Sequence, residues 1–241
     1  MSKYRAFVLA AVAVFFSASA VAADTLLLAA GAGYRKPVLE LLQNFTQASG
    51  IHAEASFGHM KQIETQAQQN GDIAFLIGDR VFLEPMQLAE RYLPLGQGRL
   101  VLVVARGQSI ASLQELQEPR FRRIALPDRV RAVYGKAAAT CLQRLGLEQN
   151  LSDRLLEVAT VPQVSTYVAT GEVDAGFVNL TEALALQGRV GARLEAPASC
   201  YDPIELSVGV LKGRGDSATA RAFVDYLATP AARSVLQLHG L

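Results

Sequence analysis

Two glycines follow a short apolar run near the start of the chain, in the sequence Leu26-Leu27-Leu28-Ala29-Ala30-Gly31-Ala32-Gly33-Tyr34. The run predicts a buried strand, and apolar residues at helical spacing from Val38 to Phe45 predict a helix beginning at Pro37. Glycines let the backbone approach a ligand closely, and the first turn of a helix offers N–H groups and the positive end of a dipole. The stretch is therefore suited to a small anion, although such turns also occur as plain fold geometry.

Similar turns follow two further predicted strands. The alternating segment 51–57 leads into Gly58-His59-Met60-Lys61, and the apolar segment 73–77 leads into Gly78-Asp79-Arg80. Three strand–helix units in succession predict a parallel sheet with helices on both faces. In such sheets ligands bind beyond the carboxyl ends of the strands, so all three turns are candidate binding loops.

Residues for other chemistry are sparse. The three histidines, His52, His59 and His239, are scattered, and neither a G-x-S-x-G nor an H-E-x-x-H pattern occurs. Asp79 and Asp128 follow predicted strands and could act as an acid–base pair, but aspartate at such a place is more often a helix cap. A copper site with thioether and imidazole ligands would have only His59 and Met60 as its ligands. We therefore predict no catalytic residue, no metal site and no cofactor, and keep a secreted hydrolase using the two aspartates as a minor hypothesis.

A second series of elements predicts a second lobe. The strands and helices expected there and at the C-terminus are strands at 100–105, 123–128, 158–161, 174–179 and 204–211, and helices at 134–145, 162–171, 218–227 and 230–238. The chain would cross between the lobes twice, near 100–106 and 203–211. We therefore expect a two-lobed α/β protein with a cleft, with residues 24–103 and 207–241 in the first lobe and 104–206 in the second.

The N-terminus has the pattern of a secretory signal peptide. Lys3 and Arg5 precede an apolar run at 6–16 and small residues at 17–23, so we expect cleavage before Asp24, with an uncleaved membrane anchor as the alternative. No later run reaches the roughly 18 apolar residues of a membrane span. A hydrophobic fraction of 51% and a net charge of +1 favour a globular protein and argue against a general nucleic-acid binder.

Two further features have open interpretations. Cys141 and Cys200 could pair in an oxidising compartment or stay as two separate thiols. A basic stretch between the strands of the second lobe could be a solvated face or could steer an anion toward the cleft. Its members are Arg120, Arg122, Arg123, Arg129, Arg131 and Lys136.

The whole mature chain resembles the periplasmic molybdate-binding proteins of ABC importers, which are type II periplasmic binding proteins. The segments that carry the resemblance most specifically are VPQVSTYVATGEVDAGFVN (161–179) and the closing AFVDYLATPAARSVLQLHG (222–240). The resemblance implies a two-lobed clamshell with two crossover strands as its hinge, and a tetrahedral oxyanion held by backbone N–H groups and hydroxyls. It also implies a periplasmic monomer that serves an inner-membrane permease.

The ligand positions depart from the family pattern. Gly33 stands where the family has serine, Gly58-His59-Met60 where it has a serine-rich loop, and Val133-Tyr134-Gly135 where it has Pro-x-Gly. Asn179 replaces a tyrosine, whereas the valine contact matches as Val164. The ligand-binding residues that we predict are Gly33, Tyr34, His59, Met60, Tyr134, Gly135, Val164 and Asn179. Because hydroxyl donors are replaced, an organic anion or a metal complex in the same clamshell stays open beside molybdate or tungstate.

Overall fold

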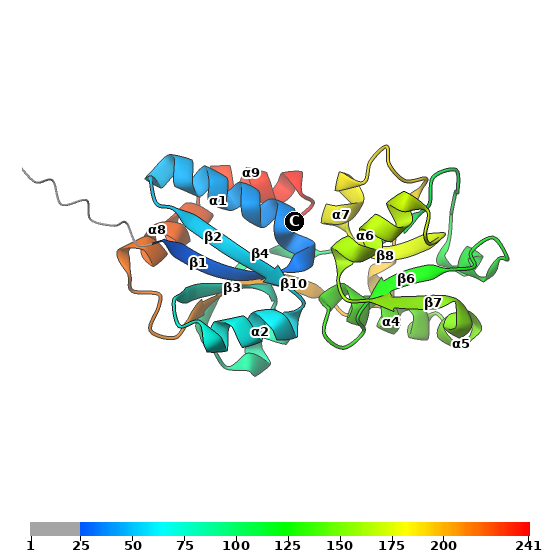
Figure 1. Ribbon diagram of the computed structural model, residues 1–241, viewed down its shortest axis with the longest axis horizontal. Coiled ribbons are helices and arrows are strands. Elements are labelled where there is room, and N and C mark those ends of the chain that lie inside the picture. The colour runs from blue at the N-terminus through cyan, green and yellow to red at the C-terminus, as the bar shows by residue number, and fades with distance from the viewer. Residues whose placement is uncertain (1–24) are drawn as a thin grey trace, which may run out of the picture.

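The computed structural model describes residues 25–241, so the predicted signal peptide at 1–23 lies outside the described residues. These residues form two lobes side by side, each built on its own five-stranded sheet (Figure 1). Among them no helix has the length and apolar character needed to cross a membrane. The predicted two-lobed α/β architecture is confirmed.

The first sheet has the strand order β2-β1-β3-β10-β4. Its first three strands, β1 (Leu26–Gly31), β2 (Ala53–Gly58) and β3 (Ile73–Asp79), are parallel as predicted. β10 (Ile204–Leu211) returns from the second lobe and pairs antiparallel with both β3 and β4 (Ala89–Gly98). All three parallel strands therefore end at the same edge of the sheet, which faces the second lobe (Figure 1).

Helices cover both faces of the first sheet. α1 (Arg35–Ser49), α8 (Ala218–Leu227) and α9 (Pro230–Leu238) lie on one face, and α2 (Met60–Gln69) with the short α3 (Arg80–Leu83) lies on the other (Figure 1). Phe45 and Phe75 both contact Phe223 between the first layer of helices and the sheet, with ring centroids 5.2 Å apart in each pair. The Phe45–Phe223 pair is edge to face, and the Phe75–Phe223 pair is tilted. This buried aromatic cluster anchors α1, whose N-terminus points toward the second lobe.

The second sheet has the order β7-β6-β8-β5-β9. Its strands are β5 (Leu100–Val104), β6 (Ile124–Pro127), β7 (Leu155–Val158), β8 (Ala175–Asn179) and β9 (Arg193–Glu195). α6 (Val161–Thr170) and α7 (Leu180–Ala185) lie on one face, and α4 (Val133–Arg144) and α5 (Glu148–Leu151) on the other (Figure 1). Short 3₁₀ turns complete the described chain at Ala32–Tyr34, Glu84–Met86, Leu113–Gln117, Ser152–Arg154 and Ala198–Cys200.

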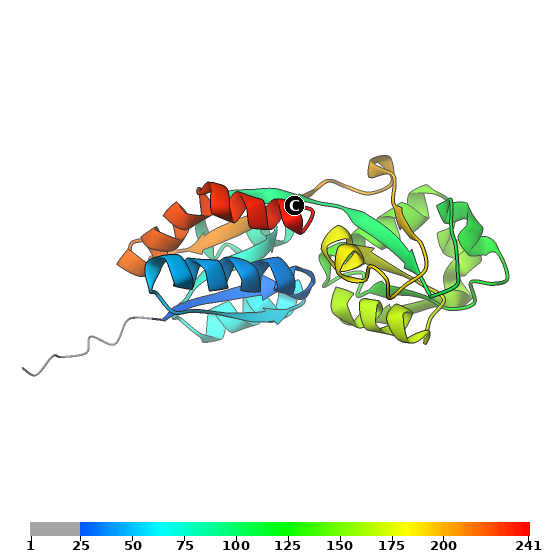
Figure 2. The same cartoon turned by 90° about the horizontal axis from the view of Figure 1, so that it is seen from above.

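Two segments join the lobes (Figure 2). The chain leaves the first sheet between the end of β4 at Gly98 and the start of β5 at Leu100, and it returns where β10 begins at Ile204. β5 pairs with β8 and β9, so it belongs to the second sheet, although the predicted boundary of 103/104 put most of it in the first lobe. The predicted boundary of 206/207 likewise falls inside β10.

Two local predictions differ from the structure. The strand expected at 158–161 is instead Leu155–Val158, and Val161 already begins α6 because Pro162 occupies its second position, where a missing N–H costs nothing. β4 had not been predicted, because Pro94, Gly96 and Gly98 interrupt its apolar pattern. The sheet tolerates this proline because β4 lies at its edge.

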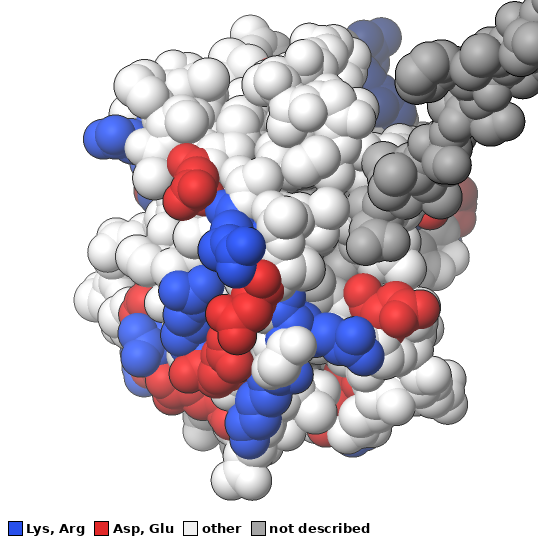
Figure 3. Space-filling model, turned by 90° about the vertical axis from the view of Figure 1, so that its left-hand side faces the viewer, with Lys and Arg blue, Asp and Glu red and all other residues white. Residues whose placement is uncertain are grey.

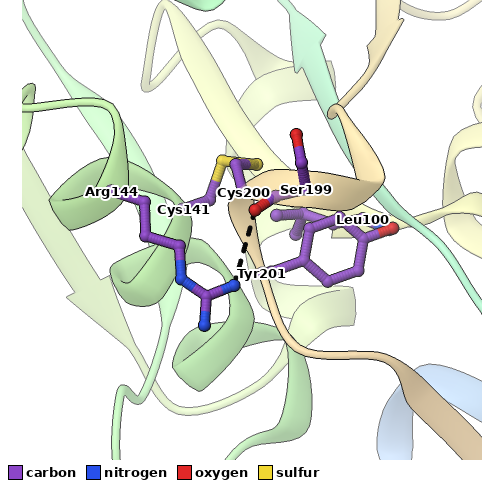
Figure 4. The surroundings of a disulfide bond; sticks show 6 residues. All are labelled: Leu100, Cys141, Arg144, Ser199, Cys200 and Tyr201. Carbon is purple, nitrogen blue, oxygen red and sulfur yellow. Dashed lines mark hydrogen bonds between the residues drawn. A yellow bond between two sulfur atoms is a disulfide. The ribbon is translucent and has the colours of Figure 1, made fainter.

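Cys141 and Cys200 form a disulfide in the second lobe (Figure 4). Cys141 lies on α4, and Cys200 ends the 3₁₀ turn that precedes the return to the first lobe. Beside the bridge, the Arg144 guanidinium donates to the Ser199 carbonyl, and the Leu100 N–H donates to the Tyr201 hydroxyl at 3.2 Å. The disulfide therefore ties α4 to one of the two connecting segments, and the open question from the sequence is answered in favour of pairing.

Candidate functional site

A small cavity of about 30 Å³ lies between the lobes, where the strand ends of the two sheets face each other. Four chain segments form its wall: 31–34 and 58–60 from the first lobe, and 132–134 and 159–161 from the second. Each segment is a turn that leads into a helix, namely α1, α2, α4 and α6. The first two predicted binding loops therefore meet at one site, whereas the third, at Gly78–Arg80, does not line it.

Three of these helices begin without a side-chain cap. The N-cap positions of α1, α4 and α6 are Tyr34, Ala132 and Thr160, and none of them accepts a hydrogen bond on its side chain from the first turn. By contrast, the N-cap residues of α7, α8 and α9 lie outside the cavity wall, and each accepts a first-turn N–H on its side chain. These residues are Asn179, Ser217 and Thr229. First-turn N–H groups lack partners within their own helix. The cavity thus brings together three helix N-termini that have no side-chain cap.

No charged side chain lines the cavity among the described residues. Its wall is glycine, alanine, valine and methionine, with the polar side chains of Tyr34, His59, Tyr134 and Thr160. Arg131, just outside it, is held by Asp128 through its Nε at 2.5 Å. An anion in this cavity would be bound by amide and hydroxyl dipoles rather than by a counter-charge.

Three of the six cations of the basic stretch, Arg120, Arg129 and Arg131, pair with neighbouring carboxylates. Arg120 pairs with Glu115 at 2.6 Å, and Arg129 pairs with Glu148 at 2.8 Å. Lysine and arginine are likewise interleaved with acidic side chains on the end of the first lobe that faces away from the second (Figure 3). These arrangements favour a solvated face over a steering field.

Tyr34 and Tyr134 meet across the interface between the lobes. Their hydroxyl oxygens are 3.1 Å apart, and both rings are almost fully buried. Burial raises the pKa of both hydroxyls, so both stay protonated at neutral pH. Either hydroxyl can be the donor in this pair.

His59 lines the cavity and also caps α2. Its Nδ1 accepts the N–H of Gln62 at 3.2 Å, and the Gln62 side chain accepts the His59 N–H in return. Burial and then the Arg131 guanidinium lower the pKa of His59, against a smaller opposite effect of Asp128. The ring is therefore held neutral with Nδ1 as acceptor, which leaves Nε2–H as its donor.

The Met60 amide, a predicted donor, already has a partner. Its N–H donates to the Arg131 carbonyl at 2.9 Å, which makes a further bond between the lobes. The Met60 side chain is buried against the strand ends, close to Gly31 and Gly78, where a Cβ on Gly78 would lie 2.4 Å from its terminal methyl carbon. Met60 therefore packs the floor of the site.

Three predicted site residues lie outside the cavity wall. A Cβ on Gly135 would lie 2.1 Å from the Asp128 carbonyl, so this glycine allows α4 to start close to the end of β6. Val164 is fully buried under the second sheet against Gly176. Asn179 uses its side chain on backbone groups of Gly33 and Glu182. Gly33, Tyr34, His59, Met60 and Tyr134 are the predicted residues that the structure brings together.

Thr160 and Val161 are site residues that had not been predicted. They line the cavity at the start of α6, one turn before Val164. Pro162 could have pointed to these two residues, because proline is favoured in the first turn of a helix and so marks where α6 begins.

Asp79 and Asp128 are structural. Asp79 accepts the N–H groups of Val81 and Glu205, and burial raises its pKa. Burial also acts to raise the pKa of Asp128, but the Arg131 side chain and nearby backbone amides outweigh it and lower that pKa. Neither carboxylate lines the cavity among the described residues, so this geometry favours the expected capping role over the minor hypothesis of an acid–base pair.

Two lobes with a shared cavity at facing strand ends define a two-lobed solute-binding protein. The chain belongs to the family described as bacterial extracellular solute-binding protein, whose model matches residues 26–241.

Similar proteins include two molybdate-binding proteins ModA. The chain is 26% identical to that of Rhodobacter capsulatus over 91% of its own length and 88% of the relative's. It is 28% identical to that of Azotobacter vinelandii over 92% of each chain. A solved structure of the periplasmic molybdate-binding protein of Azotobacter vinelandii superposes with a TM-score of 0.82 and 23% identity, covering 89% of this chain and 97% of that one.

Proposed function

We propose that this protein binds a small tetrahedral oxyanion of the molybdate and tungstate class between its lobes and delivers it to an ABC permease of the inner membrane. The single observation that supports this most strongly is the convergence of three uncapped helix N-termini, those of α1, α4 and α6, on one cavity. Such N-termini bind anions through N–H groups and the helix dipole. The similarity to molybdate-binding proteins over about nine-tenths of the chain points to the same ligand class.

The size of the cavity favours a simple oxyanion over the alternative ligands. Its volume of about 30 Å³ suits an ion of a few atoms, whereas sites for larger organic ligands measure roughly 300 Å³ or more. The wall offers donors but no carboxylate, so a fully deprotonated anion fits it better than a protonated one. An organic anion or a metal complex would require the lobes to stay further apart than they are here.

The proposed setting follows from the same similarity. The protein acts in the periplasm as a monomer, after removal of the signal peptide predicted at 1–23. Ligand binding closes the two lobes by a hinge motion in the segments around Gly98–Leu100 and 201–204. The permease then accepts the closed, loaded form. No cofactor, nucleic acid or catalytic step has a role in this proposal.

Thermal unfolding with a panel of anions tests the proposal. Sodium molybdate and tungstate at 1 mM are expected to raise the unfolding temperature, since a ligand that binds only the folded state stabilises it. Sulfate, phosphate and phosphoenolpyruvate serve as comparisons, and titration calorimetry gives the affinities. Stabilisation by phosphoenolpyruvate alone would favour an organic anion, and the absence of any stabilisation would contradict the proposal.

A further inference from the structure

Asn179 lies beside the cavity, outside its wall, with both ends of its side-chain amide in use. It is the last residue of β8 and only 1% exposed. Its Oδ1 accepts the N–H of Glu182 at 3.0 Å, which caps α7, and its Nδ2 donates to the carbonyl of Gly33 at 2.8 Å. Glu182 belongs to the second lobe and Gly33 to the first, so this one side chain joins the lobes.

The bond to Gly33 fixes a peptide group of the binding loop. The Gly33 carbonyl and the Tyr34 N–H belong to the same planar peptide unit, and this N–H is already used within the 3₁₀ turn Ala32–Tyr34. Holding the carbonyl therefore fixes the turn itself, whose residues line the cavity. Asn179 can thereby set the position of the Gly33 backbone without contacting the ligand.

The contact leaves little room for other side chains. A Cβ on Gly33 would lie 3.2 Å from the Asn179 Nδ2 and 3.4 Å from a methyl carbon of Val161, so Gly33 allows the two lobes to approach. Asparagine supplies an acceptor to Glu182 and a donor to Gly33 at once. Aspartate would retain the acceptor and, when ionised, has no donor. Serine would retain the acceptor, but its side chain is shorter, so its O–H does not reach the Gly33 carbonyl while the oxygen caps α7.

We propose that Asn179 is a positioning residue that couples closure of the lobes to the backbone position of Gly33 in the binding loop. The bond between Asn179 and Gly33 exists only when the lobes are closed, so it stabilises the closed state and slows release of the ligand. The predicted effect on ligand release rests on the proposed function. The predicted effect on lobe closure does not, because it is measurable without any ligand.

Asn179→Ser tests the inference, because serine is also a good N-cap and preserves α7. Molybdate is expected to dissociate about 5- to 100-fold faster from this variant in stopped-flow experiments, with little change in the association rate. Asn179→Asp, an equally good cap, is expected to show at least as large an effect. Ser217→Ala is the matched control, because it removes the cap of α8 in the same way but far from the cleft. It is expected to lower the unfolding temperature and leave dissociation unchanged.

Lobe closure is measured separately with spin labels on Gln69→Cys in the first lobe and Asp153→Cys in the second. Both positions are exposed. Double electron–electron resonance measures the distance between the two labels. It is expected to show a smaller closed population in Asn179→Ser than in the parent, with and without 1 mM molybdate. Equal closed populations in both proteins, or equal acceleration of release by Ser217→Ala, would overturn the inference. Failure of the parent to bind molybdate would contradict the proposed function alone, because the ligand-free distances still decide the role of Asn179.

Discussion

The hydroxyl of Tyr34 in the first lobe lies 3.1 Å from the hydroxyl of Tyr134 in the second, at the wall of a shared cavity. One hydrogen bond between two hydroxyls uses only one of their two protons. Among residues 25–241, the hydrogen bond between the two hydroxyls is the one that either of them donates. Under the proposed function we expect a bound anion to accept the second proton, which would make the pair a single donor shared between the lobes.

The first prediction concerns this shared proton. Tyr34→Phe and Tyr134→Phe each leave one hydroxyl with its proton, so each is expected to weaken molybdate binding less than about fivefold. The double variant removes the donor and is expected to lose about 10- to 150-fold, the value of a hydrogen bond to a charged group. Titration calorimetry of all four proteins measures the coupling. A double-variant loss equal to the product of the two single losses would show that the hydroxyls act independently.

The second prediction concerns the uncapped start of α4. Val133→Pro removes one N–H at the first helical position, where proline is well tolerated, and the extended backbone of Ala132 suits a following proline. Molybdate affinity is expected to fall about tenfold or more. Ala218→Pro makes the same change at the start of α8, away from the cavity, and is expected to bind normally. Equal affinities of the two variants would argue against a ligand-bound amide at Val133.

The third prediction concerns pH. Because the pKa of His59 is lowered by burial and by Arg131, the folded state binds fewer protons than the unfolded chain below the ordinary histidine value near 6.5. The free energy of unfolding therefore falls as pH decreases through that value and is unaffected above it. Urea unfolding at pH 7.5 and 5.5 measures this, and His59→Asn, which retains a capping acceptor, is expected to lose less on acidification. An identical loss in both proteins would contradict the assigned role of His59.

The fourth prediction concerns the disulfide. Cys141 and Cys200 are separated by 59 residues, and a bridge that closes such a loop stabilises the fold by about 4 kcal/mol in the chain-entropy model. Cys141→Ala with Cys200→Ala is expected to lower the urea midpoint markedly. Molybdate affinity is expected to change little, because neither cysteine lines the cavity. An unchanged midpoint would show that the loop is constrained without the bridge.

Much of the fold could be predicted because its inner strands contain continuous apolar runs. β3 and β5 are buried along their whole length. Each contains a short continuous run of apolar residues, which is typical of a strand buried on both faces. α8 and α9 match their predicted bounds because Ser217 and Thr229 mark their starts. β4 could not be found this way, because an edge strand that is mostly half-buried has no clear apolar period.

The site was only partly predictable because its donors are backbone groups, which any residue type can supply. Glycine in the loops at 31–34 and 58–60 was a usable sign of a binding loop. Val161, at the start of α6, has a side chain that gives no such sign. Asn179 illustrates the opposite case: its amide predicted a ligand contact, but both ends bond to the backbone of two lobes. Side-chain chemistry identifies such a residue as important without showing which partner it takes.

The most direct test of the account is the anomalous scattering of tungsten in crystals grown with sodium tungstate. The account predicts one strong peak in the cavity between the lobes, with oxygens within hydrogen-bond distance of first-turn amides of α1, α4 and α6. A peak beside lysine or arginine side chains, with the cavity lacking tungsten, would contradict it.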